Sequence, residues 1–270
     1  MKRHIPYHYL FFLLVVSFIV SCKSAKLSDA EEKHRIGEYY EAAAIYRKVY
    51  TKTPPTKRDL RGYIAFRMAE CNRLINNTPR ATSAYMNALR YDYPDSIVSL
   101  RLGQMYQKSG RYGEAIKYYN DYLLANPGSM LALNGVLGCE EAPKWKQTPT
   151  RYQVKRMEKF NSRRSEFSPM LYGEKYDQLY FASTRTPKSG GKEKEETNNA
   201  ITGQRNNDFY LVKQDENGAW LAPVELEDEV NTEFDEGTPS FSKNGNTMYY
   251  TSSSNSTGAN HAPFSSCLTK

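Results

Sequence analysis

Few residues of this chain have the types and spacing that catalysis or metal binding requires. Its cysteines include no Cys-x-x-Cys pair, and its histidines are scattered along the sequence. Zinc sites draw their ligands from closely spaced pairs of such residues, so the sequence argues against a zinc site. Cys71 and Cys139 fall in expected helices, where a thiol buried among apolar side chains is the simpler interpretation. The cysteines and histidines are Cys22, Cys71, Cys139, Cys267, His4, His8, His34 and His261.

The densest group of carboxylates lies between residues 225 and 236. Paired carboxylates can act as general acid and base or can bind calcium. This group precedes a strand-like segment, and no histidine, serine nucleophile or further ligand set accompanies it. A solvated connecting loop is therefore the preferred interpretation, and the sequence predicts no enzyme activity and no cofactor. The acidic residues are Glu227, Asp228, Glu229, Glu233, Asp235 and Glu236.

The cysteine at position 22 comes directly after an export signal. A basic start precedes the apolar run Leu10–Val20, which is too short to cross a bilayer as a helix. The run ends in Ile19-Val20-Ser21-Cys22, which resembles a bacterial lipoprotein box. The resemblance implies that residues 1–21 are a signal peptide and that Cys22 takes up lipid of the outer membrane. An ordinary secretory signal with an incidental cysteine is the alternative.

The residues after Cys22 bear on where the chain is held. Residues 22–26 would form a short lipidated tether, and they lack the acidic run that favours display on the outer cell face. The expected place is therefore the periplasmic face of the outer membrane. Lipidation of Cys22 would leave an odd number of thiols, which argues against a disulfide framework.

The next segment carries a helical pattern that repeats. Apolar and small residues recur at helical spacing on both sides of Gly110, which predicts two short helices packed against each other. Ala42, Ala81 and Ala115 hold equivalent places in three successive copies of this pattern. The clearest copy contains Leu102, Gly103, Tyr106, Gly110, Tyr112, Ala115, Tyr119 and Pro127.

This pattern resembles the tetratricopeptide repeat, whose period of about 34 residues matches the interval from Ala81 to Ala115. For any single copy, a generic helical hairpin is the alternative. The resemblance implies a repeat domain over residues 27–142. The pattern of Leu131, Leu133, Val136, Leu137 and Cys139 predicts a closing helix, Met130–Ala142, that covers the last repeat and ends at Pro143. The first helix of each pair would line a concave groove that binds partner proteins. The predicted groove residues are Tyr63, Phe66, Glu70, Arg73, Leu100, Gln104, Gln107 and Lys108, although Phe66 and Leu100 could instead pack against neighbouring helices.

Residues 143–164 are rich in basic side chains. A nucleic-acid stripe is one interpretation, but the segment is short and lies downstream of an export signal. The formal net charge of +7 is also too small for a nucleic-acid footprint, so a basic linker is preferred and no nucleic-acid partner is expected. The basic residues are Arg151, Lys155, Arg156, Lys159, Arg163 and Arg164.

From Phe167 the apolar pattern alternates as in β-strands. A phrase containing Leu179 and Tyr180 returns later as Met248 and Tyr249, which resembles the blade repeat of TolB-like β-propellers. Residues 165–260 would form about one and a half blades, with Trp220–Leu226 as an outer strand and Thr186–Asn207 as a long mobile loop. Residues 261–270 match no blade strand. A truncated copy of a longer protein is the first interpretation, and a natural short form completed by a partner is the second.

The whole order resembles the PorE-like lipoproteins of the type IX secretion and gliding machinery. The expected fold class is α + β multidomain, with an α-solenoid of tetratricopeptide helix pairs followed by an incomplete antiparallel β-propeller. The resemblance implies a non-enzymatic, lipid-anchored scaffold that binds other secretion or envelope proteins. Peptidoglycan binding is expected of the full-length family but not of this chain. The alternative function is a carbohydrate-binding or hydrolytic propeller with an accessory repeat domain.

Overall fold

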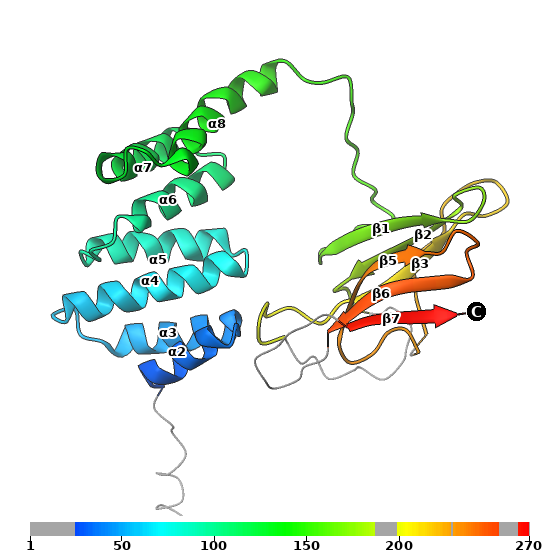
Figure 1. Cartoon of the computed structure of the whole chain (residues 1–270), viewed down its shortest axis with the longest axis horizontal. Coiled ribbons are helices and arrows are strands. Elements are labelled where there is room, and N and C mark those ends of the chain that lie inside the picture. Colours follow the sequence, from blue (N-terminus) through cyan, green and yellow to red (C-terminus); the bar gives the residue numbers. More distant parts are fainter. Residues whose placement is uncertain (1–24, 187–198, 228, 254–263, 270) are drawn as a thin grey trace, which may run out of the picture. The chain divides into compact units, whose positions relative to one another are not determined.

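The computed structural model describes residues 25–186, 199–227, 229–253 and 264–269, the last of these by its backbone alone. The chain divides into two compact units between Glu140 and Glu141. Across the described ranges, the first unit is built from helices and the second from antiparallel sheets, so the fold is α + β (Figure 1). The signal peptide and Cys22 lie outside the described residues. Among the helices that are described, none has the length and apolar character needed to cross a membrane.

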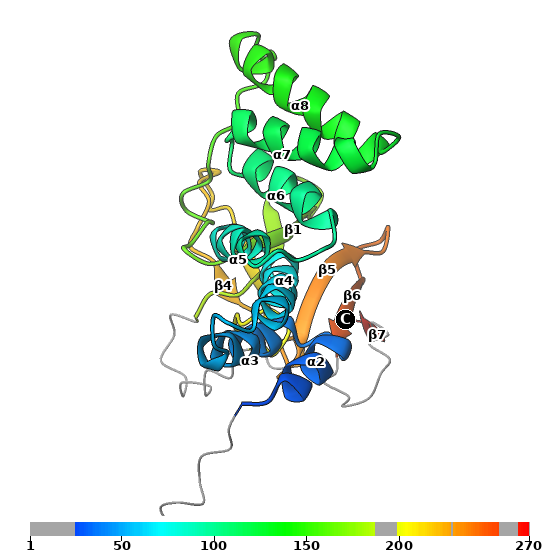
Figure 2. The ribbon, with the colours of Figure 1, turned by 90° about the vertical axis from the view of Figure 1, so that its left-hand side faces the viewer.

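The helical unit stacks its helices in chain order, each one against the next (Figure 2). Because no single short helix buries enough apolar surface by itself, each pair depends on its neighbours. The elements are α2 (Leu27–Arg35), α3 (Tyr39–Lys52), α4 (Arg58–Leu74), α5 (Thr78–Arg90), α6 (Ile97–Lys108), α7 (Tyr112–Ala125) and α8 (Met130–Gln147).

The second helix of each pair buries an alanine and a tyrosine one turn apart. The three predicted alanines are fully buried, and a tyrosine four residues after each of them is at most 2% exposed. Residues at i and i+4 share one helix face, so each pair presents a small and a large side chain to the core. The predicted equivalence of Ala42, Ala81 and Ala115 is therefore confirmed. Their tyrosines are Tyr46, Tyr85 and Tyr119.

The turn inside each pair requires a residue with positive φ five positions before the alanine. Gly37 has φ of 86°, and Gly110, around which the sequence predicted a helical pair, has φ of 72°. In the middle copy the same position is Asn76, with φ of 63°. Asparagine is the residue that best tolerates this conformation after glycine, which explains why the pattern of this copy is weaker.

Helices α6 and α7 cross in close contact at Gly103. The space opposite Gly103 is filled by the ring of Tyr119, not by Ala115: a Cβ at position 103 would lie 2.6 Å from Cδ1 of Tyr119. A Cβ at Gly135 on α8 would lie 2.5 Å from Cζ of the same ring. Tyr119 therefore occupies the space between two glycines of different helices.

Helix α8 departs from the prediction in two respects. It runs through Pro143 to Gln147, so the proline bends or weakens the helix without ending it. Its buried residues are Ala132, Gly135 and Cys139, whereas Leu131 and Leu137 are 56% and 57% exposed. Of the residues expected to cover the last repeat, Cys139 is buried and Val136 packs against the core. Leu131 and Leu137 stay exposed, because the ring of Tyr119 leaves room only for a small residue at the contact with Gly135.

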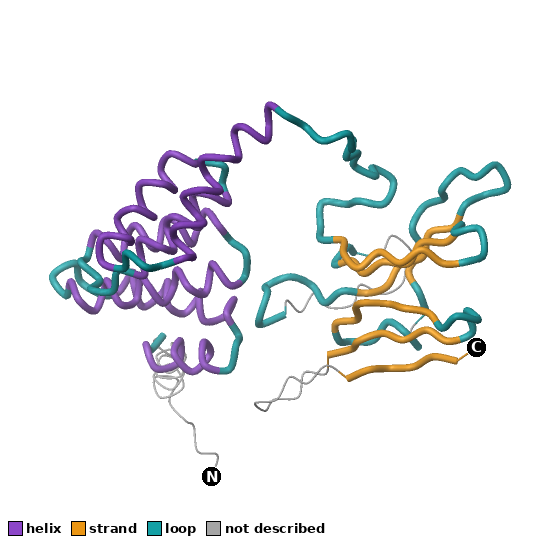
Figure 3. The backbone as a smooth tube through the Cα atoms, turned by 45° about the horizontal axis from the view of Figure 1, so that its top comes forward, coloured by secondary structure: helices purple, strands orange, loops and turns teal. Residues whose placement is uncertain are grey.

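The β-unit contains two antiparallel sheets (Figure 3). The first has the order β1-β2-β3-β4 and the second the order β5-β6-β7. We call them sheet 1 and sheet 2. Their bounds are β1 (Glu166–Tyr172), β2 (Gln178–Ser183), β3 (Asp208–Lys213), β4 (Val224–Glu225), β5 (Asp235–Phe241), β6 (Thr247–Ser253) and β7 (Phe264–Thr269).

Three expectations about the β-unit need correction. The tail was expected to match no strand, but β7 pairs with β6 over its whole length. The outer strand expected over Trp220–Leu226 is reduced to β4, with Trp220 in an isolated bridge to Gln214. In the loop expected to be mobile, the described part from Asn199 is held by hydrogen bonds, among them one from Asn199 Nδ2 to Asp235 Oδ2 at 3.0 Å.

The two sheets pack with opposite faces in contact. The inner face of sheet 1 carries Tyr180, Ala182 and Phe209, and it packs against Met248 and Tyr250 of sheet 2. In the repeated phrase, those two residues correspond to Leu179 and Phe181, which lie on the other face of sheet 1. Sheet 2 therefore contacts sheet 1 through the face that carries Met248 and Tyr250. The equivalent face of sheet 1 is its outer face, which points away from sheet 2.

Candidate partner-binding face

The predicted groove residues lie on two first helices of the stack. Tyr63, Phe66, Glu70 and Arg73 are on α4, and the other four are on α6. We call this set the first-helix face. It comprises Tyr63, Phe66, Glu70, Arg73, Leu100, Gln104, Gln107 and Lys108.

The aromatic part of this face is packed against its neighbours. Phe66 stacks on Tyr93, with ring centroids 4.4 Å apart, and it is tilted against Tyr85 at 6.2 Å. Tyr63 donates a hydrogen bond to Glu31 on α2 at 2.9 Å. Burial, followed by this hydrogen bond, raises the pKa of Tyr63 to about 12. Both side chains stay half-buried, so they serve the core and the surface together.

Glu70 is the centre of the polar part. Its Oε2 accepts a hydrogen bond from Arg73 at 2.6 Å, its Oε1 lies 3.2 Å from Nε of Arg101, and the hydroxyl of Tyr85 also donates to it. The carboxylate is 13% exposed, and the two arginines are 24% and 25% exposed. Burial raises the pKa of Glu70, but the hydrogen bonds from Arg73 and Tyr85 outweigh it and hold that pKa below the usual value.

The effect of Glu70 is to fix two guanidinium groups at the surface. A flexible arginine loses rotamer freedom when it binds, and a carboxylate that already orients it removes part of that loss. Arg67 extends the line of cations along α4, and its Nη2 contacts Nδ1 of His34 at 3.0 Å. Burial and the charge of Arg67 lower the pKa of His34, so the imidazole stays neutral beside the guanidinium.

The α6 residues divide into core and surface. Leu100 is 4% exposed and belongs to the core of the helical unit, so it offers no surface to a partner. Gln107 accepts a hydrogen bond from the hydroxyl of Tyr119 at 2.6 Å, and Gln104 accepts one from Arg101 at 3.1 Å. Lys108 is exposed and donates to Asn76 of the preceding pair. The structure thus keeps the hydrophilic members of the α6 set near the surface and withdraws its one apolar member.

Sequence reasoning missed Arg67, Arg101 and Tyr93. A signal for Arg67 was present, since it lies four residues after Tyr63 and therefore on the same helical face. Arg101 lies three residues before Gln104 and carries the same signal. Tyr93 lies beyond the end of α5 in an irregular segment, so no periodicity in the sequence could have brought it to Phe66.

Part of the acidic cluster, which was expected to be a loop, lies in a strand of the β-unit. Asp235 and Glu236 form the start of β5, and Glu236 is fully buried, whereas Glu229 and Glu233 are exposed. Asp228 lies outside the described residues. Glu236 Oε1 accepts hydrogen bonds from the hydroxyls of Thr232 at 2.5 Å and Ser252 at 3.3 Å. The expectation of a wholly solvated loop was wrong at its last two residues, because they pair into a sheet.

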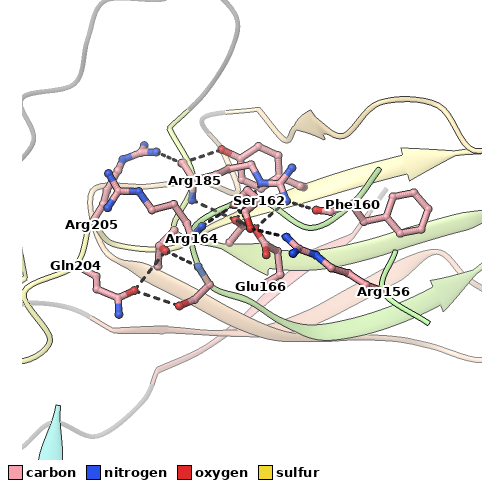
Figure 4. Close-up of polar contacts among 12 residues, drawn as sticks. Arg156, Phe160, Ser162, Arg164, Glu166, Arg185, Gln204 and Arg205 are labelled. Atoms are coloured by element: carbon pink, nitrogen blue, oxygen red, sulfur yellow. Dashed lines mark hydrogen bonds and ion pairs between the residues drawn. The ribbon is translucent and has the colours of Figure 1, made fainter. Parts of the chain in front are cut away.

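Sheet 1 holds an equivalent carboxylate with a different partner. Glu166 Oε1 accepts hydrogen bonds from Ser162 at 2.5 Å and Ser183 at 3.2 Å, and it also binds Nη2 of Arg185 at 3.0 Å (Figure 4). The guanidinium of Arg185 lies 5.0 Å from the ring centroids of Phe181 and Tyr210. Arg185 is therefore held by one carboxylate and two rings on the outer face of sheet 1.

Beside Arg185 the β-unit has a cleft of about 630 Å³. Its walls carry charges of both signs, from Lys159, Arg164 and Glu158, and the ring of Tyr210. In the described part of the chain, no group of three or more histidine, cysteine or acidic residues is placed to hold a metal ion. Cys71 and Cys139 are free and buried, as the sequence suggested, and burial raises the pKa of the Cys71 thiol to about 12.

Comparisons with known proteins add little to this geometry. No family model matches the chain, and no curated protein matches it either. Among solved structures, a likeness was found to the crystal structure of MamA protein, at 16% identity and a TM-score of 0.30. The match covers 44% of this chain and 81% of that one. So weak a likeness carries no argument about what this chain does.

Proposed function

We propose that this chain is a non-enzymatic, lipid-anchored scaffold at the periplasmic face of the outer membrane, and that its helical unit binds partner proteins. The observation that carries the proposal is the Glu70 centre, which holds Arg73 and Arg101 in place at the surface of α4 and α6. Pre-oriented guanidinium groups beside a half-buried aromatic suit a folded or extended peptide better than a small substrate.

The charge of this face selects the class of partner. The first-helix face and its neighbours carry the cations Arg67, Arg73, Arg101 and Lys108 against the carboxylates of Glu70 and Glu31. A segment with acidic side chains would therefore be steered to the face and held by bidentate contacts with the arginines. Envelope proteins of the type IX secretion machinery, whose PorE-like lipoproteins this chain resembles in its order of segments, are the proposed partners.

We also propose that the helical unit is a tetratricopeptide repeat domain and that the two sheets are blades of a propeller. Structural repeats within each unit support this assignment. The alanine–tyrosine pairs and positive-φ turns recur as in tetratricopeptide repeats. The sheets recur with the same cross-strand pair at their ends, Glu166 with Ser183 and Glu236 with Ser252. Packing of unlike faces is what successive propeller blades require, because each blade must present a different face to each neighbour.

A binding role also fits the chemistry of the buried carboxylate. Glu236 is fully buried and its Oε1 is engaged by two hydroxyl groups, so a substrate has no access to that oxygen. A general acid or base must lie within hydrogen-bond reach of the reacting group. We therefore favour a scaffold over a hydrolytic propeller.

Photocrosslinking in cells tests the proposed partner-binding face. A benzophenone amino acid at position 108 should form adducts with envelope proteins, and the same probe at Asn120 on α7 is the matched control. Replacing Arg73 and Arg101 by glutamate should abolish the adducts while an α-helical spectrum is retained. Adducts that persist in the double variant would show that the arginines do not bind the partner.

A further inference from the structure

The two sheets are preceded by the same local structure. In each copy, two successive backbone N–H groups donate to one carbonyl oxygen three and four residues earlier. In each copy, the residue that follows has a hydroxyl side chain. The hydroxyl oxygen accepts a hydrogen bond from the backbone N–H two residues later, and the hydroxyl group donates one to the carboxylate of a glutamate four residues later. The first copy uses Met157, Phe160, Asn161, Ser162 and Glu166, and the second uses Glu227, Val230, Asn231, Thr232 and Glu236.

The asparagine of the second copy joins the two sheets. Asn231 is 1% exposed, and its side-chain amide hydrogen-bonds both backbone groups of one residue of β3. Its Oδ1 accepts from the backbone N–H of Phe209 at 2.7 Å, and its Nδ2 donates to the Phe209 carbonyl at 3.0 Å. The same Nδ2 lies 3.0 Å from the carbonyl of Leu226. Asn231 thus clamps the segment before sheet 2 onto the third strand of sheet 1.

The asparagine of the first copy has no such strand to hold. Asn161 is exposed, and its side-chain amide makes no hydrogen bond with the part of the chain that the structure describes. It lines the cleft of about 630 Å³ together with Ser162, Arg185 and Tyr210. In the second copy the corresponding space is filled by sheet 1. The first copy therefore has the same local structure as the second, but its asparagine side chain lies at an open cleft and not against a strand.

We propose that Asn161 binds the third strand of sheet 2 in a second copy of this chain. Sheet 2 of one copy would then stand against the outer face of sheet 1 in the next, in the arrangement that the two sheets have within one chain. The strand register identifies the residue to be held. Phe209 is paired with Ala182, and its counterpart in sheet 2 is Ser265, which is paired with Thr251.

Exposed apolar residues on the outer face of sheet 1 and on the face of sheet 2 that carries Tyr249 support a second copy of this chain as the partner. On the outer face of sheet 1, Leu171 is 47% exposed, while its counterpart Phe241 is packed against Tyr172 and Tyr180 of the other sheet. On the free face of sheet 2, Tyr249 is 49% exposed, while its counterpart Tyr180 is buried. Among the described residues, neither of these two faces has a sheet packed against it, whereas the counterpart of each face does.

The contact is between unlike faces, so each copy can bind one neighbour through sheet 1 and either another neighbour or the same one through sheet 2. A contact of this kind leaves one face free at each end and either closes into a ring or extends. The inference concerns the β-unit alone. It does not depend on the proposed binding of partners by the helical unit, and the two can fail separately.

Sedimentation velocity of the chain with residues 1–21 removed and Cys22 replaced by serine tests the proposal. The chain should assemble with increasing concentration. Asn161→Ala should weaken the assembly about ten- to a hundredfold, which is the range expected for two lost hydrogen bonds. At concentrations too low for assembly, its melting midpoint should equal that of the parent chain. Asn120→Ala, an exposed asparagine on α7, should leave the assembly intact.

A comparison variant separates association from folding. Asn231→Ala should lower the melting midpoint of the β-unit, because its clamp acts within one chain. A chain that stays monomeric up to about 100 μM would overturn the proposal, and so would an Asn161→Ala variant that assembles like the parent. Binding of Asn161 to a different protein only, without self-association, would likewise exclude a second copy as the occupant.

Discussion

The ring of Tyr119 on α7 lies directly against the backbone of Gly103 on α6. A Cβ atom at position 103 would stand 2.6 Å from Cδ1 of that ring, which is far inside van der Waals contact. On its other side the ring meets Gly135 of α8, so it has no room to withdraw. We therefore expect Gly103→Ala to destabilise the helical unit by about 1–3 kcal/mol through overpacking.

A matched glycine provides the control for this prediction. Gly113 lies in the first turn of α7, and a Cβ there would meet nothing within 4 Å. Gly113→Ala should stabilise the helix by up to about 1 kcal/mol, because alanine has the higher helix propensity. Urea unfolding followed by circular dichroism measures both changes. Shifts of the same sign for the two variants would contradict the packing described for Tyr119.

The carboxylate of Glu70 should contribute more to stability than an ordinary surface pair. Glu70→Ala leaves Arg73, Arg101 and the hydroxyl of Tyr85 without their shared acceptor, and we expect a loss of about 1–3 kcal/mol. Glu114→Ala is the control, since Glu114 is 44% exposed in its pair with Arg111, where water screens the charges, and it should change stability much less. Equal effects in urea unfolding would contradict a central role for Glu70.

The two equivalent glutamates of the β-unit should give stability opposite dependences on pH. Burial raises the pKa of Glu236 to about 7, with the charge of Asp208 adding to it and the hydroxyl of Thr232 opposing it. The folded state therefore binds this proton more tightly than the unfolded state, whose carboxyl has a pKa near 4.5. Its contribution to stability is fully present below about pH 4.5 and is lost as the pH rises to about 7.

Glu166 should behave in the other sense. Burial alone would raise its pKa, but the hydrogen bonds from Ser162 and Arg185 have the larger effect and hold the pKa below the usual value of 4.5. Its contribution is therefore present above about pH 4.5 and is lost as the pH falls below that value. Thermal unfolding of Glu236→Gln and Glu166→Gln from about pH 3 to about pH 8 covers both pH windows and measures the two contributions. If both substitutions change the pH dependence of the melting midpoint in the same direction, the opposite pKa shifts of Glu236 and Glu166 are wrong.

The lipid at Cys22 stays a prediction of the sequence. Mass spectrometry of the mature chain should show an acylated amino terminus at Cys22, and Cys22→Ala should abolish it and release the chain from membranes. Cys139→Ala is the control, because that thiol is buried in the helical unit and should not affect anchoring. A Cys22→Ala variant that stays in the membrane pellet with unchanged mass would rule out the anchor.

Much of the helical unit could be predicted because its determinants are local. A positive-φ turn, an alanine five residues later and a tyrosine four residues after that lie within one helical hairpin, so their spacing is visible in a single stretch of sequence. The repeat of the β-unit was visible for the same reason, as a phrase around Tyr180 that returns around Tyr249. The predicted partner-binding face was placed on α4 and α6, but the burial of Leu100 could not be read from its helical position.

By itself, the sequence determined where helices and most strands form, where the chain turns, and which residues are equivalent between copies. Only the tertiary structure decided that α8 packs through Ala132 and Gly135 instead of its leucines, that the tail pairs as β7, and that Glu70 holds Arg101 from the next pair. The physical reason is the same in each case. These features depend on the shape of a surface contributed by a distant segment, and apolar periodicity records which face of an element is buried, not what buries it.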